Sequence, residues 1–373
     1  MKVLFTIDAL INAGTERSML DLVPHFSSDT KLTVVYFYQY HDLKEAYKEA
    51  GIPVIFADLK GSFTFIQGIR KLMTIIKQEK PDIIISSLLR ANIISRIACK
   101  LTGTKLIGTF VSDSYSEQRS ASFSLKRKAG AAYYYWLDRL TSGIPVAWIS
   151  NSQSIKKSNC AALHLSEQKV TVIYRGRSTG LFKQWVPPVN HSGFHFASVG
   201  RLYEPKGFYE MITAFNEVCK RYPEIKLDIY GDGPYRNKLT TLINDLQLQE
   251  KITLHGNIKN AWQKLYEADC FVFSSWYEGF SGALVEAMMT GIPIIASDIP
   301  MNLEAVAADD TALIHRVKDK DSIVQKMTEM ITADPVKMLE MGKRARAAAL
   351  SRFDMKMIAH EYETFVREQI KKA

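Results

Sequence analysis

Residues 270–293 read CFVFSSWYEGFSGALVEAMMTGIP, and this stretch indicates the fold more clearly than any other part of the chain. It contains an apolar strand, Cys270–Ser275, then a turn with two glycines, and then an apolar helix that stops at Gly291 and Pro293. A helix that begins at such a turn points unpaired backbone N–H groups and the positive end of its dipole at one place. The pattern therefore predicts a phosphate site where the strand meets the helix.

Two carboxylates accompany this predicted phosphate site. Glu278 lies just before the helix, and Glu286 lies within it, eight residues later. Carboxylates do not attract a phosphate, so we interpret both as hydrogen-bond acceptors for the hydroxyl groups of a sugar or a ribose. Two glutamates at this spacing also occur by chance in many proteins, and their interpretation depends on the turns around them.

A second turn carries two fixed cations, Arg201 and Lys206, five residues apart in SVGRLYEPKG at 198–207. This loop follows one predicted strand and opens into a helix, which suits the two phosphates of a nucleoside diphosphate. A third turn, YGDGP at 230–234, also joins a strand to a helix. It is not a dinucleotide fingerprint, because Arg236 stands where the third glycine belongs and no acidic residue ends a strand about 20 residues later.

Short apolar runs alternate with helix-like segments along the whole chain. The runs are largely apolar rather than alternating, which is typical of strands buried on both faces of a parallel sheet. Since parallel strands need crossover connections, the pattern predicts an α/β fold with helices on both sides of each sheet. The predicted strands are 3–7, 32–38, 54–57, 82–86, 106–110, 170–174, 194–200, 227–231, 252–255, 270–275 and 294–297. The clearest helical spacing lies at 65–80, 209–222 and 236–246.

The length and composition favour two globular domains. The chain has 373 residues, 47% of them hydrophobic, and its 20 Gly and 12 Pro are too few for a disordered or low-complexity chain. The periodic pattern pauses at 175–192, which we interpret as a linker. We predict a first domain at 1–185, a second at 186–352 and a last helix at 353–373. That helix either crosses back to the first domain or forms a simple C-terminal cap.

The positive charge is concentrated in the first half. Residues 1–190 hold 25 Lys and Arg against 14 Asp and Glu, a net charge of +11, whereas residues 191–373 hold 23 against 25, a net charge of −2. Such a field attracts a nucleic acid, an anionic membrane surface or a phosphorylated substrate. Basic residues from Lys126 to Lys128 also precede the aromatic cluster Tyr133–Trp136. This combination suits either a segment that rests on anionic headgroups or an ordinary amphipathic helix with its aromatic side chains in the core.

The cysteines, histidines and acidic residues predict no metal site. The four cysteines have no Cys-x-x-Cys spacing, which indicates buried thiols in a reducing compartment. The eight histidines are dispersed, and only His255, at a strand end, is a candidate contact to a ligand, with a structural role as the alternative. No stretch approaches the ~18 apolar residues that span a membrane. We therefore expect a cytoplasmic protein that needs neither a metal nor another cofactor.

In their order along the chain, these motifs resemble the family-4 retaining glycosyltransferases. That family has the GT-B architecture, in which two doubly wound Rossmann-like domains face each other across a cleft and the C-terminal helix crosses back. Most of the resemblance lies within 194–300, and the first half adds only AGTER at 13–17. The matching positions are Arg201, Lys206, the turn at 231–234, HGN at 255–257, EGFS at 278–281 and Glu286.

The resemblance implies a role for each matching residue. Arg201 and Lys206 would neutralise the donor diphosphate, and Glu278 would hold hydroxyls of the transferred sugar, which makes these three the catalytic candidates. Glu286 would hold the ribose hydroxyls, and Gly14 would let a loop of the first domain approach the donor closely. The other donor-binding candidates are Thr15, Gly231, Asn257, Phe280, Ser281, Gly282 and Ala283.

The chain departs from the family pattern after the fifth predicted strand. Many relatives carry a His-Asp pair there, whose histidine contacts the transferred sugar, but this sequence reads TFVSD at 109–113. We take Asp113, together with Lys126, Arg127 and Lys128, as acceptor-side candidates. The missing histidine keeps open the alternative of a nucleotide-sugar-binding subunit with impaired catalysis.

By resemblance, catalysis would be metal-independent, electrostatic and positional, because the cations stabilise charge on the departing nucleoside diphosphate. We expect the protein to move a sugar from a nucleotide diphosphate sugar, with a UDP-sugar the first candidate, to a saccharide or lipid-linked saccharide. The expected setting is surface polysaccharide assembly, such as capsule or lipopolysaccharide, at the inner face of the cell membrane. A sugar-nucleotide epimerase on the same fold is an alternative. Nucleic acid is not an expected partner, because no known reading motif is present.

Overall fold

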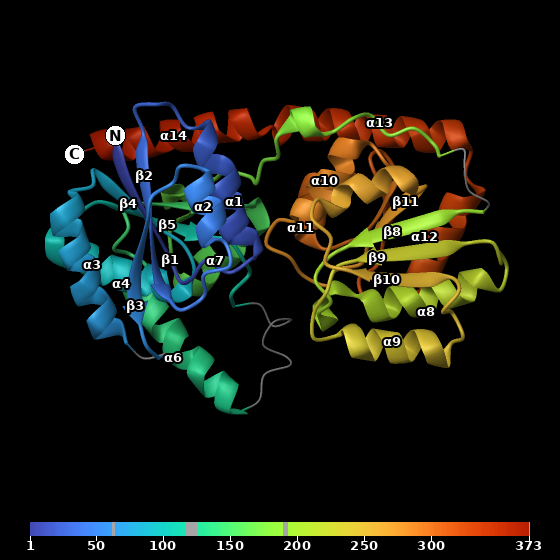
Figure 1. The fold of residues 1–373 in the computed structure, drawn as a ribbon, viewed down its shortest axis with the longest axis horizontal. Coiled ribbons are helices and arrows are strands. Elements are labelled where there is room, and N and C mark those ends of the chain that lie inside the picture. The colour runs from blue at the N-terminus through green and yellow to red at the C-terminus, as the bar shows by residue number, and fades with distance from the viewer. Residues whose placement is uncertain (62–63, 116–124, 189–192, 373) are drawn as a thin grey trace. The chain divides into compact units, whose positions relative to one another are not determined.

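The chain divides into two compact units in a computed structural model that describes residues 1–61, 64–115, 125–188 and 193–372. The first unit comprises 1–176 and 355–373, and the second comprises 177–354 (Figure 1). Each unit has its own parallel sheet with helices on both faces. Part of the predicted linker, 189–192, lies outside the described residues.

The first unit is built on a parallel sheet of seven strands in the order β3-β2-β1-β4-β5-β6-β7. All residues of β4, β5 and β6 are buried, which accounts for their mostly apolar sequence. The strands are β1 (Lys2–Ile7), β2 (Lys31–Tyr38), β3 (Val54–Leu59), β4 (Ile83–Ser86), β5 (Leu106–Phe110), β6 (Ala147–Ser150) and β7 (Val170–Val172).

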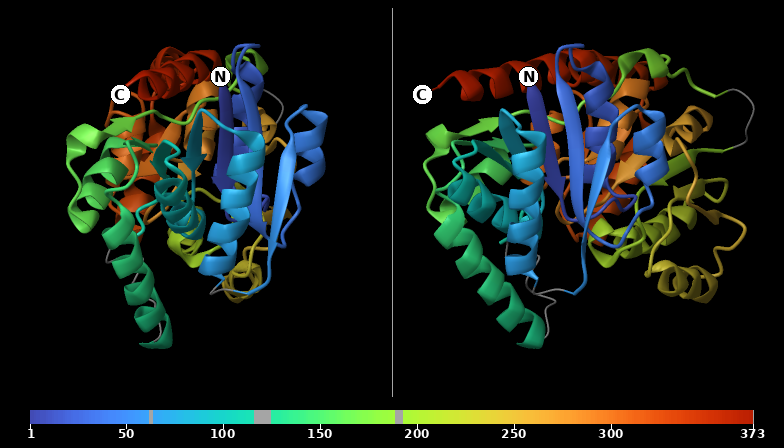
Figure 2. Two further views of the ribbon diagram at one scale, coloured as in Figure 1. Left: turned by 90° about the vertical axis from the view of Figure 1, so that its left-hand side faces the viewer. Right: turned by 60° about the vertical axis from the view of Figure 1, so that its left-hand side comes forward.

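Helices cover both faces of this sheet (Figure 2). Along β1, Val3 and Phe5 pack in the core cluster that contains residues of α1 and α14, whereas Leu4 packs in the cluster that contains residues of α3 and α4. Successive strand residues thus point to opposite faces, as the strand geometry requires. The helices are α1 (Gly14–Leu22), α2 (Lys44–Glu49), α3 (Phe65–Glu79), α4 (Leu89–Thr102), α6 (Leu125–Thr141), α7 (Gln153–Leu163) and α14 (Met355–Lys371).

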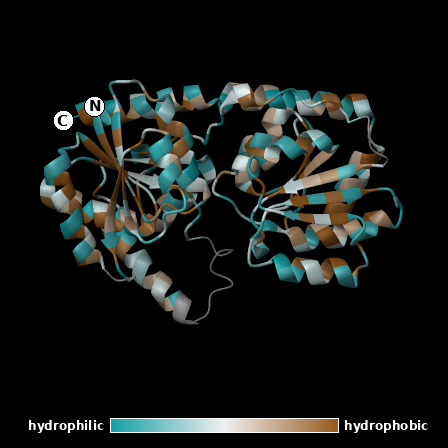
Figure 3. Cartoon of the chain, in the orientation of Figure 1, coloured by the Kyte–Doolittle hydropathy of each residue, from teal (hydrophilic) through white to brown (hydrophobic). Residues whose placement is uncertain are grey.

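The second unit has a parallel sheet of six strands in the order β10-β9-β8-β11-β12-β13. Its strands carry a mixture of mostly apolar and some polar residues, and many residues of the surrounding helices are polar (Figure 3). The strands are β8 (His195–Val199), β9 (Lys226–Tyr230), β10 (Ile252–Gly256), β11 (Cys270–Phe273), β12 (Ile294–Ser297) and β13 (Leu313–His315). The helices are α8 (Phe208–Cys219), α9 (Arg236–Asp245), α10 (Gly282–Thr290), α11 (Pro300–Ala305), α12 (Lys320–Thr332) and α13 (Pro335–Arg352).

The strand order reverses between β8 and β11, the first and fourth strands of the second unit. In doubly wound sheets, ligands bind outside the carboxyl ends of the strands at such a switch point. The turns that follow β8 and β11 are the ones that carry the predicted cations and carboxylates. The fold therefore places the two strongest sequence motifs next to each other.

The C-terminal tail consists of two helices. Helix α13 ends at Arg352 and belongs to the second unit, and α14 begins at Met355 and belongs to the first. Phe353, between them, is fully buried, and its ring contacts that of Phe280 with centroids 5.3 Å apart. The prediction that the last helix crosses back to the first domain is thus confirmed, and the alternative of a simple cap is excluded.

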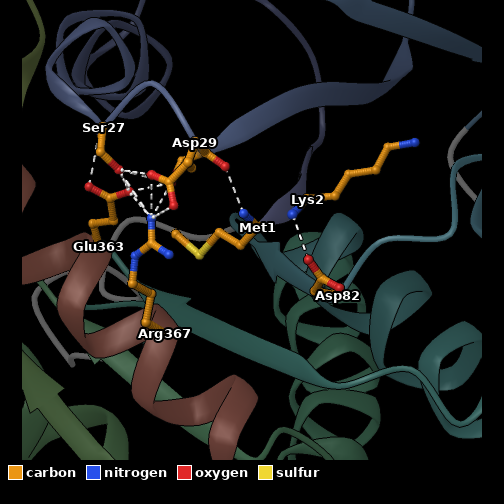
Figure 4. A network of polar contacts seen from close by, with 8 residues as sticks. Met1, Lys2, Ser27, Asp29, Asp82, Glu363 and Arg367 are labelled. Carbon is orange, nitrogen blue, oxygen red and sulfur yellow. Dashed lines mark hydrogen bonds and ion pairs between the residues drawn. The ribbon is translucent and has the colours of Figure 1, made fainter.

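A network of hydrogen bonds and ion pairs holds helix α14 against the rest of the first unit (Figure 4). Glu363 accepts hydrogen bonds from the backbone N–H of Ser27, at 3.1 Å, and from the hydroxyls of Ser27 and Thr30. Arg367 donates to Glu363 at 2.9 Å and to Asp29 at 2.8 Å. Burial raises the pKa of the Glu363 carboxyl, but the hydrogen bonds from Ser27, Thr30 and Arg367 outweigh it and lower the pKa to about 2.

The Glu363→Gln variant is expected to lower the free energy of unfolding by about 1–3 kcal/mol near neutral pH, because a buried charge-assisted acceptor is lost. The lowered pKa makes this contribution complete above the ordinary glutamate value of 4.5 and removes it as the pH falls toward 2. Urea denaturation at about pH 7 and about pH 3 measures the difference. Glu368→Gln, at an exposed position of the same helix, is the control. An equal loss for Glu363→Gln at both pH values would contradict the assignment.

Candidate functional site

The turns after β8 and β11 are joined by hydrogen bonds at the switch point of the second sheet. The backbone N–H of Trp276 donates to the carbonyl of Pro205 at 2.8 Å. The Ser274 hydroxyl donates to the carbonyls of Lys206, at 3.1 Å, and Gly207, at 2.9 Å. These bonds fix the loop that carries the cations against the loop that carries Glu278.

The turn after β9 is attached to the same structure. The backbone N–H of Gly200 donates to the carbonyl of Tyr230 at 3.0 Å, and that of Leu202 donates to the carbonyl of Asp232 at 3.0 Å. Gly231 has a φ of +147°, and a Cβ there would lie 1.9 Å from the carbonyl oxygen of Gly200. Glycine is therefore required at this turn by the close approach of two backbones.

Lys206 and Glu278 form an ion pair across the two joined turns. Their side chains are 22% and 12% exposed, so the pair is largely shielded from water but still reachable. Arg201 lies on the surface five residues before Lys206, with its guanidinium 5.1 Å from the centroid of the Tyr203 ring. Within the described part of the chain, Arg201 has no carboxylate partner, so its charge is available to an anion.

Glu286 has a cationic partner that the sequence analysis missed. Its carboxylate accepts a hydrogen bond from Nε of Arg177 at 2.7 Å, and both side chains are about four-fifths buried. The backbone N–H of Arg177 donates to the carbonyl of Phe353 at 2.9 Å. Arg177 lies in the stretch interpreted as a linker, where no periodic pattern marks its position.

The N-terminus of α10 lies between Glu278 and Glu286 along the sequence. The Ser281 hydroxyl caps the helix by accepting from the backbone N–H of Leu284 at 3.4 Å. Phe280 is 2% exposed, so its side chain belongs to the core and only its backbone is open to a ligand role. Gly282 and Ala283, the next two donor-binding candidates, form the first turn of α10, where backbone N–H groups lack helical partners.

His255 and Asn257 lie at the far edge of the same sheet, on and just after β10. Nε2 of His255 contacts Asp228 Oδ1 at 2.6 Å, and its ring stacks on Tyr230 with centroids 4.6 Å apart. These contacts support the structural alternative for His255. Asn257 is exposed beyond the strand end.

The remaining candidates belong to the first unit. Gly14 and Thr15 begin α1, and a Cβ on Gly14 would lie 3.2 Å from Nη1 of Arg175. Asp113 follows β5 and accepts a hydrogen bond from the Ser158 hydroxyl at 2.6 Å. Lys128 is exposed on α6, whereas the side chains of Lys126 and Arg127 lie outside the described residues.

Helix α6 presents apolar side chains to solvent. Tyr133, Trp136 and Leu140 are 46%, 56% and 76% exposed and recur at helical spacing. The guanidinium of Arg139 lies 5.5 Å from the Trp136 ring centroid. By contrast, the hydroxyl of Tyr135 is held by the carbonyl of Ala162 at 3.0 Å. The aromatic cluster is therefore divided between a packed and an exposed face.

The described residues contain neither a cluster of metal ligands nor a membrane-spanning helix. No group of three His, Cys, Asp or Glu side chains among them is arranged to hold a metal ion. No helix in these ranges is both long enough and apolar enough to cross a bilayer. All four cysteines are buried and free, and burial raises the pKa of Cys219 to about 11 and that of Cys99 to about 12.

Comparisons with known proteins agree with this arrangement. Residues 182–348 match the family Glycosyl transferases group 1, and residues 13–180 match Glycosyltransferase Family 4. An uncharacterized glycosyltransferase of Methanocaldococcus jannaschii is 28% identical over 63% of this chain and 60% of its own length, so less than two thirds of that relative is spanned. The UDP-Gal:alpha-D-GlcNAc-diphosphoundecaprenol alpha-1,3-galactosyltransferase of Escherichia coli is 26% identical over 76% of this chain and 74% of its own.

Two further similarities cover more of the chain. The capsular polysaccharide biosynthesis glycosyltransferase CapM of Staphylococcus aureus is 22% identical over 82% of this chain and 83% of its own length. The crystal structure of HepE from Anabaena, solved in complex with UDP-glucose, superimposes with a TM-score of 0.82 at 20% identity, over 99% of this chain and all of that one. At this identity the structural likeness shows the fold.

The Gly231→Ala variant is expected to lower the stability of the second unit by about 2–4 kcal/mol, because the new Cβ would overlap a backbone carbonyl that cannot move alone. Gly180→Ala is the matched control, since a Cβ there meets no atom within 4 Å. Urea denaturation of the two variants provides the comparison. A Gly231→Ala variant as stable as Gly180→Ala would contradict the close approach described for this turn.

Proposed function

The chain belongs to glycosyltransferase family 4 and has the GT-B fold, and on this basis we propose that it transfers a sugar from a UDP-sugar to a saccharide or lipid-linked saccharide with retention of configuration. The observation that carries the proposal is the arrangement of charges at the switch point of the second sheet. Two cations on one turn, Arg201 and Lys206, suit a diphosphate, and two carboxylates, Glu278 and Glu286, suit hydroxyl groups. These are the functional groups that a nucleotide diphosphate sugar presents.

The ion pair between Lys206 and Glu278 suits donor binding. Lys206 neutralises a carboxylate that would otherwise repel an incoming diphosphate. When phosphate oxygens replace the carboxylate as partners of Lys206, Glu278 becomes able to accept hydrogen bonds from the sugar. Binding of the diphosphate thus prepares the group that receives the sugar.

The bond to the leaving group breaks with accumulation of negative charge on the nucleoside diphosphate. Arg201, Lys206 and the N-terminus of α10 supply fixed positive charge and backbone donors where that charge develops. The acceptor hydroxyl attacks on the face from which the diphosphate departs, which retains the configuration, and a donor phosphate oxygen takes its proton. Since protein groups supply the positive charge, the proposed reaction needs no metal and no other cofactor.

The missing histidine after β5 supports a second candidate function, that of a nucleotide-sugar-binding subunit with impaired catalysis. Ser112 stands in the corresponding place and cannot donate as an imidazolium does. Asp113, the next residue, is held by Ser158. A binding subunit would bind the donor without turning it over, whereas a transferase would turn it over. Conversion of the donor without any acceptor would identify the sugar-nucleotide epimerase.

Two observations support a lipid-linked acceptor and a role in surface polysaccharide assembly. The names of the E. coli and S. aureus relatives refer to a diphosphoundecaprenol acceptor and to capsular polysaccharide. In addition, α6 exposes Tyr133, Trp136 and Leu140 next to the cations Lys128 and Arg139. Apolar side chains flanked by cations suit contact with anionic headgroups at the inner face of the membrane.

The test of the proposed function is a screen of the purified chain against UDP-, GDP-, ADP- and TDP-sugars without added metal. Calorimetry records binding, and mass spectrometry records slow hydrolysis of the donor. We expect one UDP-sugar to bind and to be hydrolysed, with no change when EDTA is present. Binding without hydrolysis, and without transfer to any acceptor, would favour the binding subunit. The absence of binding to every donor would contradict the proposal.

Arg201→Ala is expected to lower kcat by about 10²–10³-fold and the donor affinity much less, because the charge that it stabilises develops during the reaction. Glu286→Ala is expected to weaken nucleotide binding instead. Arg221→Ala, an exposed cation in the same unit, is the control and should change neither parameter. Equal losses of affinity and turnover for Arg201→Ala would count against its role in the transition state.

A further inference from the structure

The carboxyl edge of the first sheet carries a cluster of charged and aromatic side chains that the donor site does not use. The strand order reverses between β1 and β4, so this edge contains the switch point at which doubly wound sheets bind ligands. Asp8 follows β1, Tyr38 ends β2, and Arg90 lies in the first turn of α4, after β4. Tyr134 of α6 lies close enough for the charges of Arg90 and Asp8 to act on the pKa of its hydroxyl.

The protein holds the guanidinium of Arg90 from two sides. Its Cζ lies 3.8 Å from the centroid of the Tyr38 ring, and its Nε donates to Oδ2 of Asp8 at 3.4 Å. The other oxygen of Asp8 accepts from the backbone N–H of Ala91 at 2.7 Å. The guanidinium is therefore already oriented, and a ligand would lose little affinity to ordering it.

The remaining edge of the Arg90 guanidinium is accessible to a ligand. Among the described residues, Nη1 and Nη2 have no hydrogen-bond partner, and the side chain is 31% exposed. Both nitrogens reach solvent, unlike the buried and unpartnered Nε and Nη2 of Arg96. The N–H groups of this edge lie in one plane and match the two oxygens of a carboxylate. Their positive charge favours such an anion over a neutral hydroxyl group.

Two further observations mark this edge as a functional place. Leu88, between β4 and Arg90, has a φ of +73°, which residues other than glycine rarely adopt, and its side chain packs against the core of the first unit. Burial raises the pKa of the Asp8 carboxyl, although Arg90 and the backbone N–H of Ala91 act in the opposite direction. Strained backbone and shifted pKa values both concentrate at ligand sites.

The charge balance limits what can bind here. Asp8 and Arg90 cancel, so a bound group with a single negative charge leaves the cluster with a net charge of about −1. A diphosphate would bring a second negative charge close to Asp8, which repels it. The half-buried Tyr134 adds an apolar ring with a hydroxyl, and a sugar can contact both. These features together suit a sugar with one carboxylate.

We propose that Arg90 binds the carboxylate of an acidic acceptor sugar, such as a hexuronic acid. Nη1 and Nη2 each donate to one carboxylate oxygen, while Nε keeps its contact with Asp8. The inference rests on the proposed glycosyltransferase function and names a substrate class for it. Strand β5, which precedes the acceptor-side candidate Asp113, lies next to β4 in the sheet. The acceptor rather than the donor is therefore the favoured source of the carboxylate.

Saturation-transfer NMR of the full chain tests the proposal with matched pairs of probes. The pairs are the methyl α-glycosides of glucuronic, galacturonic and mannuronic acid and those of the corresponding neutral hexoses, which carry a hydroxymethyl group in place of the carboxylate. With and without UDP, at least one acid should bind about tenfold or more tightly than its neutral counterpart. A second arm compares UDP-glucuronic acid with UDP-glucose by calorimetry and reports on the donor.

Two variants make the test specific to Arg90. Arg90→Gln removes the charge and should reduce the acid to the affinity of its neutral counterpart. Arg90→Lys keeps a cation beside Asp8, which guards against a folding defect, but it lacks the planar pair of donors and should lose most of the preference. Lys100→Gln, at an exposed position of the same helix, is the control and should keep the full preference.

The outcomes separate this inference from the proposed function. If UDP binds but no acid is preferred in the first arm, the inference is overturned while the donor site stands. A preference confined to the donor arm, or one that both Arg90 variants leave unchanged, would also overturn it, since the carboxylate would then bind elsewhere. If UDP does not bind, the proposed function fails, whereas a preference that depends on Arg90 would still support the carboxylate site.

Discussion

The ion pair between Lys206 and Glu278 is the interaction on which the donor side of the molecule depends. It joins the turns that follow β8 and β11, and those turns meet because the strand order of the sheet reverses between the two strands. Hydrogen bonds from Trp276 and Ser274 to the opposite loop hold the pair in place. In such a pair at the switch point, an anionic ligand can replace the carboxylate of Glu278 as the partner of Lys206.

The other charged groups of the site, Glu286 and Arg201, are also arranged for an anionic ligand. Glu286 is paired with Arg177, so both carboxylates begin with a cationic partner, whereas Arg201 keeps its charge for the ligand. Catalysis by such a site depends on fixed charges that need not rearrange during the reaction.

The features that the sequence predicts are those formed by residues close together in the chain. The strand, turn and helix of 270–290 follow one another directly, so apolar runs and glycines predict them, and the α/β fold and its family follow. Strands β6 and β13 were not predicted, although strands of the same length, such as β4 and β7, were. Arg177 pairs with a residue 109 positions away, and such a contact depends on tertiary structure alone.

The central claim is that Glu278 and the donor diphosphate compete for Lys206. Calorimetric titration of UDP into the Glu278→Gln variant tests it most directly, because the substitution removes the competing charge and keeps the size of the side chain. The account predicts that this variant binds UDP more tightly than the unchanged protein and transfers sugar more slowly. Weaker binding of UDP by Glu278→Gln would contradict it, since Glu278 would then support the diphosphate rather than exchange with it.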